Sequence, residues 1–206
     1  RVNNIAKGAA LMTDTTVSRR QIDGTSNTLS NQVLEKVIHS NLLAAPLPVY
    51  TEDEIVYAKQ LKATFVYDGL PGTMTDQNPQ VRKIVAEKTD NGHAALNNFI
   101  MPYVPSSAYS AGSTDVGDVS WLTPTAQFTA VTWPSGSPGH SWQNVSCGKT
   151  GIGHKGLLLA AKVLAGTAAD LMTNPKHLQE ARMEFHTTAA DGYDCPIGKD
   201  LVPKPQ

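Results

Sequence analysis

The sequence predicts an α/β domain in which helices flank a small sheet. Three observations support this prediction: several segments carry apolar residues at helical spacing, two segments between them have the composition of strands, and the helix expected at residues 150–172 is apolar on most of its sides. A helix without a polar face is expected to lie buried between layers. Because the strands are fewer than the helices, the sheet is expected to leave some helical faces uncovered.

The first elements in chain order are a short helix and a strand. Residues 2–12 carry apolar side chains at helical spacing. Residues 16–22 are expected to form a strand, although Val17 and Ile22 do not share one alternating face. The polar neighbours of this strand suit the edge of a sheet.

Two further helices are predicted from their capping residues. Ser30 is the expected N-cap of a helix that continues to Leu43 and stops before two prolines. Thr51 and Glu54 form a capping box, because the hydroxyl can accept an unpaired amide while the carboxylate reaches back to the N-cap. A helix is therefore expected to begin directly after Thr51.

Residues 68–105 are rich in Gly, Pro, Asn and Asp, and they contain one short helical pattern at 81–87. A stretch of this length without regular structure is uncommon in a compact domain, and long loops often carry function. We interpret residues 68–105 as an irregular insertion that covers another part of the domain.

Regular structure is expected again after this insertion. Residues 126–133 are mostly apolar and are expected to form a strand that ends in a segment rich in Gly, Pro and Ser. The apolar helix at 150–172 follows. Asn174 and Pro175 then supply an N-cap and a first-turn proline for the last helix.

Composition and charge exclude several classes of partner. The chain has 206 residues with 17 Lys and Arg against 18 Asp and Glu, so its formal net charge is −1. This balance gives no electrostatic footprint for nucleic acid or for an acidic membrane surface, and neither partner is expected. Cys147 and Cys195 are too few for a disulfide framework. We therefore expect a soluble protein of the cytoplasm.

Two segments have compositions that serve no packing purpose. The first is 111–121, in which Gly112, Ser113, Thr114 and Asp115 precede a short predicted helix. An ordinary N-cap explains most patterns of this kind. Anion binding or a carboxylate that lines a site is the alternative.

The second segment is 135–142, directly after the strand expected at 126–133. It contains His140, and loops at strand ends are where α/β proteins build their sites. A surface or capping histidine is the ordinary interpretation, and a metal ligand or catalytic group is the alternative. From these residues alone, both interpretations stay open.

Taken together, four motifs resemble one family. Their sequences are AGSTDVGDVSW at 111–121, PGHSW at 138–142, GHKGLLLAAKVLA at 153–165 and IAKGAALMT at 5–13. With these motifs the chain resembles the M20 family of metallopeptidases and amidohydrolases, most closely the branch that contains the B subunit of p-aminobenzoyl-glutamate hydrolase. Their order and spacing match the carboxyl-terminal half of those enzymes over nearly the whole chain.

The resemblance implies a dimeric hydrolase whose α/β catalytic domain holds two divalent metal ions, zinc or manganese, and carries a smaller inserted lid domain. Residues 1–25 would be the last helix and strand of the lid or dimerisation domain, and residues 26–206 the carboxyl-terminal part of the catalytic domain. His140 matches a metal-ligating histidine of the family. The segment from Gly112 to Asp115 matches one that lines the same cleft.

The family's other metal ligands and its general base have no counterpart in this chain, so no catalytic residue is expected here. One histidine is too few for a centre of two ions, each of which needs about three protein ligands. The chain is therefore expected to be an inactive fragment of an enzyme that cleaves an N-acyl or p-aminobenzoyl amide of an amino acid such as glutamate. The rival expectation is a non-catalytic scaffold or regulatory subunit that pairs with another chain.

Overall fold

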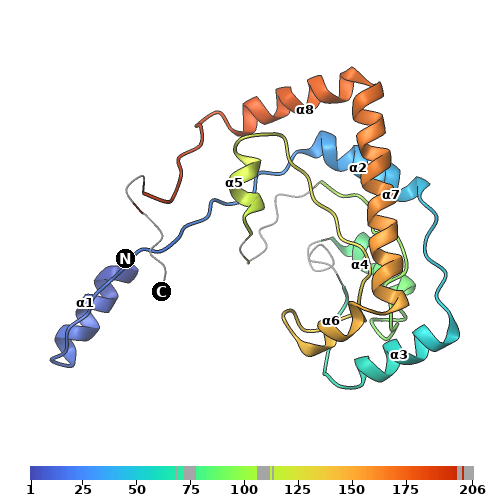
Figure 1. The fold of residues 1–206 in the computed structure, drawn as a ribbon, viewed down its shortest axis with the longest axis horizontal. Helices are drawn as coiled ribbons and strands as arrows, with labels where there is room; N and C mark the ends of the chain where they lie inside the picture. Colours follow the sequence, from blue (N-terminus) through green and yellow to red (C-terminus); the bar gives the residue numbers. More distant parts are fainter. Residues whose placement is uncertain (68, 72–77, 106–111, 113, 199–200, 202–206) are drawn as a thin grey trace.

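The computed structural model of the chain describes all residues except 68, 72–77, 106–111, 113, 199–200 and 202–206 (Figure 1). In this described part, all regular structure is helical. The helices are α1 (Val2–Met12), α2 (Gln32–Ala44), α3 (Glu52–Lys62), α4 (Pro79–Lys88), α5 (Val116–Ser120), α6 (Trp142–Cys147), α7 (Gly151–Thr173) and α8 (Pro175–Thr188).

The predicted sheet is not found among the described residues, so the predicted α/β fold class is wrong for this chain. Residues 16–22 and 126–133 have strand-like sequences, but they lie far apart in the molecule (Figure 1). A strand exists only where a neighbour completes its ladder of backbone hydrogen bonds. Without that neighbour, both segments run as irregular connections between helices.

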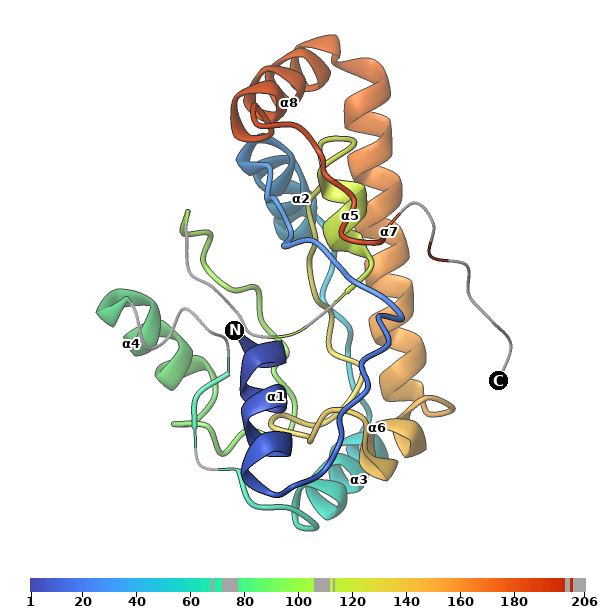
Figure 2. The same ribbon diagram turned by 90° about the vertical axis from the view of Figure 1, so that its left-hand side faces the viewer.

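α2, α7 and α8 form the packed body of the molecule (Figure 1, Figure 2). Ile38 of α2 lies in one buried cluster with Leu159 and Val163 of α7. Farther along the same pair of helices, Gly166 lies against the Asn41 side chain, where a Cβ would collide with it. A glycine at this position therefore lets the two helices approach closely.

The amino terminus of α2 is held from two sides. Asn31, rather than the expected Ser30, is the N-cap, and its side chain accepts an amide of the first turn. From α8, the Glu184 carboxylate accepts the amides of Gln32 and Val33 at 2.8 and 3.0 Å. These hydrogen bonds satisfy amides that the start of a helix leaves unpaired, and they join α8 to α2.

The predicted capping box at α3 is confirmed. The Thr51 amide donates to Glu54 Oε2 at 2.7 Å, and the Glu54 amide donates to Thr51 Oγ1 at 3.3 Å. The same carboxylate oxygen accepts Lys155 Nζ of α7 at 2.6 Å. The hydrogen bonds from Lys155 and from the Thr51 amide lower the pKa of Glu54, and the bond from Lys155 connects α3 to the amino-terminal part of α7.

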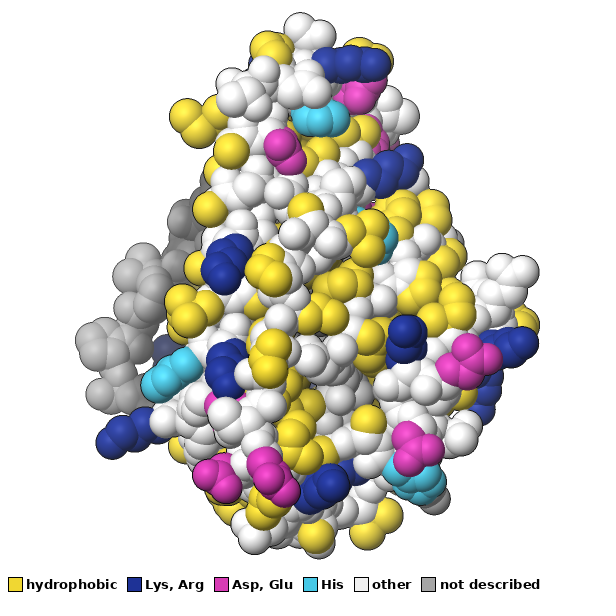
Figure 3. All heavy atoms as spheres, turned by 90° about the vertical axis from the view of Figure 1, so that its right-hand side faces the viewer, with side chains coloured by type: hydrophobic (Ala, Val, Ile, Leu, Met, Phe, Trp, Pro, Cys, Tyr) yellow, Lys and Arg dark blue, Asp and Glu magenta, His cyan; other side chains and the backbone are white. Residues whose placement is uncertain are grey.

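α7 is packed along one side only, so the expectation that this helix lies buried between layers is wrong. Leu157, Leu158 and Leu164 are all more than half exposed. Hydrophobic side chains are spread over much of this side of the molecule (Figure 3). By length and mean hydropathy α7 could also cross a membrane. Its other side, however, packs into the folded body through Ile152, Gly153, Gly156, Leu159, Val163 and Thr167.

Residues 126–133 cross α7 as a non-helical segment. Ala126 and Phe128 pack against one buried cluster, and Val131 packs against another. Gly156 allows this crossing, because a Cβ there would collide with the Val131 carbonyl oxygen. The course of this segment therefore depends on one glycine of α7.

Residues 68–105 are more ordered than predicted in the parts that the structure describes. Asn78 caps α4, which contains the expected helical pattern and buries two valines. After α4, the Lys62 ammonium of α3 donates to the carbonyl oxygens of Gly92 and Ala94 at 2.7 and 2.8 Å. Partial burial lowers the pKa of Lys62.

α1 is helical as predicted, but it buries none of its residues. It lies apart from α2, α7 and α8 (Figure 1). Its large apolar side chains, Val2, Ile5, Leu11 and Met12, are 71% to 87% exposed. The assignment of residues 1–25 to a lid domain and of 26–206 to a catalytic domain stays a prediction.

Candidate functional site

The loop at residues 134–141, called the histidine loop below, follows the segment that crosses α7. Its first part is held in place by two contacts. The Ser135 amide donates to the Ala95 carbonyl oxygen at 2.8 Å. Gly136 adopts a positive φ of 78° and lies against the Tyr67 ring, where a Cβ would have no room. Both contacts join the loop to segments that are distant in sequence.

The second part of the histidine loop is fixed by the start of α6. Ser141 is the N-cap of this helix, and its hydroxyl donates to the Pro138 carbonyl oxygen at 2.6 Å. One residue into α6, the buried Gln143 donates from Nε2 to Thr64 Oγ1 at 3.2 Å. The loop is thus anchored on both sides of His140.

His140 itself is exposed and has a positive φ of 53°. A side chain other than glycine in this left-handed region costs roughly 1–2 kcal/mol, and it persists where the surroundings determine the conformation. No described residue forms a hydrogen bond with its imidazole. The structure therefore presents an unpaired imidazole on an anchored loop, which suits a ligand or metal contact.

The segment before α5 behaves partly as an ordinary N-cap. Thr114 Oγ1 accepts the Val116 amide at 3.4 Å, whereas the exposed Asp115 carboxylate makes no capping hydrogen bond. Gly112 is also exposed, and Ser113 lies outside the described residues. The side chain of Asp115 therefore remains available, as a residue that lines a site would be.

α5 is held in place by two residues that are distant in sequence, one before it and one after it. The Ser26 amide and the Tyr193 hydroxyl both donate to Asp118 Oδ1, at 3.2 and 3.0 Å. Desolvation raises the pKa of the Asp118 carboxyl, but these hydrogen bonds outweigh it, and the pKa of Asp118 is lowered. They give the short helix that follows Asp115 a defined position.

His140 and Asp115 lie at the starts of two different helices, α6 and α5. No hydrogen bond or ion pair between described residues joins their segments. The described part of the chain also contains no group of three or more His, Cys, Asp and Glu side chains that could hold a metal ion. Since a divalent ion needs about three protein ligands, these residues alone do not form a metal centre, and His140 is a candidate for one ligand.

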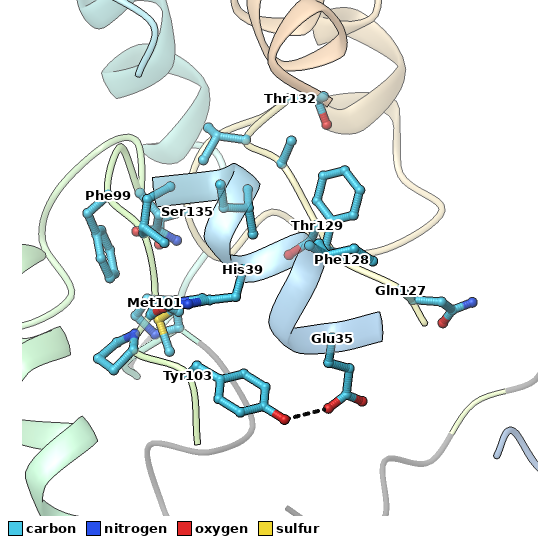
Figure 4. A pocket seen from close by; sticks show the side chains of 18 of the residues that line it. Glu35, His39, Phe99, Met101, Tyr103, Gln127, Phe128, Thr129, Thr132 and Ser135 are labelled. Atoms are coloured by element: carbon cyan, nitrogen blue, oxygen red, sulfur yellow. Dashed lines mark hydrogen bonds between the residues drawn. The ribbon is translucent and has the colours of Figure 1, made fainter. Parts of the chain in front are cut away.

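A cavity of about 550 Å³ lies between α2, residues 97–104 and residues 127–136 (Figure 4). The Tyr103 hydroxyl donates to Glu35 Oε2 of α2 at 3.2 Å. Burial, together with the neighbouring Glu35 carboxylate, raises the pKa of Tyr103 to about 12. The phenol therefore stays protonated and keeps its role as a donor across the neutral range.

His39 also joins α2 to the wall of this cavity. Its Nε2 lies 3.1 Å from the Met101 carbonyl oxygen, and its ring lies beside that of Tyr103. Sequence reasoning missed the cavity, because its walls come from three segments that are far apart in the sequence. The only local signal is the apolar run around Phe99 inside the predicted insertion.

Comparisons with known proteins identify a relative. No protein-family model and no solved structure matches the chain. Among curated proteins, the chain is 39% identical over 214 residues to the B subunit of p-aminobenzoyl-glutamate hydrolase from Escherichia coli (strain K12). The match covers 100% of this chain and 43% of the relative, so the chain spans less than half of that protein's length. The resemblance to this hydrolase subunit, which the four motifs indicate, is therefore confirmed.

Proposed function

We propose that this chain is part of a metal-dependent amidohydrolase of the M20 type, which cleaves a p-aminobenzoyl or N-acyl amide of an amino acid such as glutamate. The observation that carries this proposal is the 39% identity to the B subunit of p-aminobenzoyl-glutamate hydrolase, which extends over the whole chain. A match restricted to one motif would leave the chemistry open. Here the aligned region includes both segments that the sequence singles out, at 111–121 and 135–142.

The proposed reaction is the hydrolysis of an amide bond. The oxygen of water bonds to the carbonyl carbon, the C–N bond breaks, and the nitrogen leaves as an amine after it takes up a proton. Divalent ions, zinc or manganese, would supply the polarisation of the carbonyl group and the activation of water. The described residues offer too few ligands for such ions, so no step of this reaction is assigned to this chain by itself.

His140 is the residue that we assign to metal binding. Its exposure and its anchored backbone support this role, because a neutral imidazole binds a metal ion through one ring nitrogen. Gly112, Ser113, Thr114 and Asp115 are proposed to line the same cleft. The remaining ligands and the general base would come from residues outside this chain, and the isolated chain would accordingly be inactive.

The proposal extends to partners and location. The relative is named as a subunit, which supports a pairing of this chain's protein with a second copy or with a related subunit. The name of the relative supports a small-molecule amide substrate, and the balanced charge of −1 gives no electrostatic reason to propose a nucleic acid or a membrane surface instead. We place the protein in the cytoplasm, since two cysteines are too few for the disulfide framework that is typical of secreted domains.

A substitution of His140 tests this function in the natural protein that contains the chain. His140→Ala is expected to reduce metal content and to lower the rate of p-aminobenzoyl-glutamate hydrolysis by at least about 100-fold, because even the outer-shell partners of metal ligands matter by 10–100-fold. Metal analysis and initial rates provide the measurement. His154→Ala is the matched control, since His154 is an exposed histidine on α7.

Normal metal content and near-normal rates in the His140→Ala protein would remove the ligand assignment. Circular dichroism of both variants would show whether the helices are intact. The wild-type full-length protein can also be tested on other N-acyl amino acids. If it hydrolyses these but not p-aminobenzoyl-glutamate, the proposed substrate is wrong and the proposed amide hydrolysis stands.

A second candidate is a non-catalytic scaffold or regulatory subunit. The exposed apolar residues of α1 and α7 favour it, because large exposed apolar surfaces commonly mark contacts with another protein. The intact mass of the natural protein separates the two candidates. A natural product of 206 residues that binds another chain, and whose complex is unaffected by His140→Ala, would support the scaffold.

A further inference from the structure

We propose that Tyr193 and Asp118 are positioning residues of the hydrolase: together they hold α5, and through it residues 112–115, in the conformation that contacts the substrate. This inference rests on the proposed function for the role of residues 112–115. It assigns a task to the segment after α8, which no part of the proposed reaction uses.

Residues 112–115 have few contacts of their own. Gly112, Thr114 and Asp115 are exposed, and between described residues their hydrogen bonds stay within residues 112–117. α5 has only five residues, whereas an isolated helix needs about 12–15 residues to be even marginally stable in water. The position of residues 112–115 therefore depends on the contacts that hold α5.

One side of α5 is held by residues 26–29, which precede α2. The Leu29 amide donates to Ser120 Oγ at 2.8 Å, and Ser120 is only 1% exposed. Gly117 lies against the Ser26 carbonyl oxygen, where a Cβ would collide with it. These contacts fix how closely α5 approaches residues 26–29, and they do not involve Tyr193.

Asp118 is the residue of α5 on which two distant segments meet. Its Oδ1 accepts the Ser26 amide at 3.2 Å and the Tyr193 hydroxyl at 3.0 Å. Because the pKa of Asp118 is lowered, its carboxylate is ionised at neutral pH. Hydrogen bonds to an ionised acceptor are roughly twice as strong as those between neutral groups. The carboxylate therefore joins α5 to the chain before α2 and to the chain after α8.

The segment that carries Tyr193 is itself attached to the chain before α2. Gln21 Nε2 donates to the Pro196 carbonyl oxygen at 3.1 Å, and Gly24 packs closely against Pro196. The Tyr193 side chain is partly buried. α5 lies beside both segments (Figure 1, Figure 2). The tyrosine hydroxyl is thus brought to Asp118 by a segment with contacts of its own.

The loss of the Tyr193 hydroxyl is expected to loosen α5 without unfolding the protein, since residues 26–29 keep their contacts with it. One hydrogen bond to a charged acceptor shifts an equilibrium between ordered and loosened states by about 10-fold. The apparent affinity of a site falls with the fraction of molecules in which the site is formed. Weaker substrate binding, with little change in the chemical step, is therefore the expected signature.

Steady-state kinetics of the natural full-length protein test this signature with p-aminobenzoyl-glutamate as the substrate. We expect Tyr193→Phe to raise KM between about 3-fold and 10-fold, while kcat and metal content change by less than about 2-fold. Tyr103→Phe is the matched control, because it removes another tyrosine hydroxyl that donates to a carboxylate, that of Glu35. Its KM should equal that of the wild type. An unchanged KM in Tyr193→Phe, or an equal rise in both variants, would overturn the proposal.

Variants of Asp118 test whether Tyr193 acts through this carboxylate. Asp118→Ala removes the acceptor of both hydrogen bonds, so its KM should rise at least as much as that of Tyr193→Phe. Two residues that act as a unit are not additive, so adding Tyr193→Phe to Asp118→Ala should cause no further rise. Rises that multiply in the double variant would overturn the proposal. Asp118→Asn keeps an acceptor oxygen and is expected to recover part of the loss in Asp118→Ala.

Hydrogen exchange of the backbone amides supplies a readout that is independent of hydrolysis. In the full-length protein, Tyr193→Phe is expected to accelerate exchange in residues 116–122 by about 10-fold and to leave α2 and α7 unchanged. If circular dichroism shows that Tyr193→Phe does not fold, Asp118→Asn replaces it, with changes in the same direction. Equal exchange in wild type and variant would overturn the proposal. Faster exchange in a protein that is inactive toward amides would refute only the proposed function.

Discussion

α1 and α7 show how two helices with similar sequence patterns contribute differently to a fold. Both carry regular apolar spacing and both contain glycine, but α1 buries no residue while α7 buries one full side. Gly156 of α7 lies against the Val131 carbonyl oxygen, whereas Gly8 of α1 has nothing within 4 Å. Periodicity in the sequence determines that both segments are helical. Contacts with other elements determine which helix stabilises the molecule.

The largest effect on this comparison is expected from Gly156→Val. The new side chain would collide with the Val131 carbonyl oxygen and the Thr132 methyl group, so residues 126–133 would have to move away from α7. We expect a loss of about 3 kcal/mol in the free energy of unfolding, the upper range for overpacking in a well-packed site. Urea unfolding followed by circular dichroism measures it. Leu157→Val, at the next and exposed position, is the control, and its effect should stay within about 0.5 kcal/mol.

An intermediate effect is expected where α3 meets α7. Glu54→Gln keeps a side chain that can complete a capping box but removes the charge that pairs with Lys155. We expect a loss of about 1–2 kcal/mol at neutral pH, because hydrogen bonds to charged groups contribute more than neutral ones and this pair is partly exposed. Urea unfolding of both proteins between pH 3 and pH 7 measures the difference.

The pH dependence of this difference follows from the lowered pKa of Glu54. The stabilisation should be fully present above the unfolded pKa of about 4.3 and should disappear as the pH falls through the lower folded pKa. The wild type and Glu54→Gln should therefore converge in acid. A difference that stays constant down to pH 3 would contradict the ion pair. Glu52→Gln, at an exposed position in the same first turn, is the control for helix charge alone.

The smallest effect is expected from Gly8→Ala in α1. Alanine favours a helix over glycine by up to about 1 kcal/mol, and the structure leaves open space for the methyl group. We expect slower amide exchange within α1 and no change in the urea midpoint of the remaining helices. A clear shift of that midpoint would show that α1 packs onto the body of the protein.

The helices were predictable where local side chains fix their ends. Thr51 with Glu54 and Asn174 with Pro175 act within a few residues of themselves, and the structure confirms both caps. The start of α2 shifted by one residue, because Asn31 both caps the helix and donates to the Ala181 carbonyl oxygen of α8. That second bond is a tertiary contact, which a local pattern cannot contain.

The predicted sheet and the predicted burial of α7 between layers are wrong for the same physical reason. An apolar run such as 126–133 indicates a segment able to form a strand, but the hydrogen bonds of a strand lie on another segment. In the same way, the composition of α7 predicts burial on every side, while the described chain covers one side only. Both errors arise because a sequence shows what a segment requires and not whether a partner is present.

The candidate site was predictable in part. His140 and Asp115 stood out in the sequence, and the structure shows both exposed, with His140 on an anchored loop. Their assignment to one metal cleft stays a prediction. The cavity beside α2 was not predictable, because Tyr103, Glu35 and Ser135 come together only through the packing of α2 against two distant segments.

The Lys62 ammonium has a consequence for how this protein can diversify. By binding the carbonyl oxygens of Gly92 and Ala94, 30 and 32 residues away, it acts as a non-covalent cross-link at the base of a long loop. The entropy of closing a loop grows only slowly with its length. Homologous proteins should therefore tolerate insertions and deletions between α3 and α4, provided that this lysine and its two acceptors are retained.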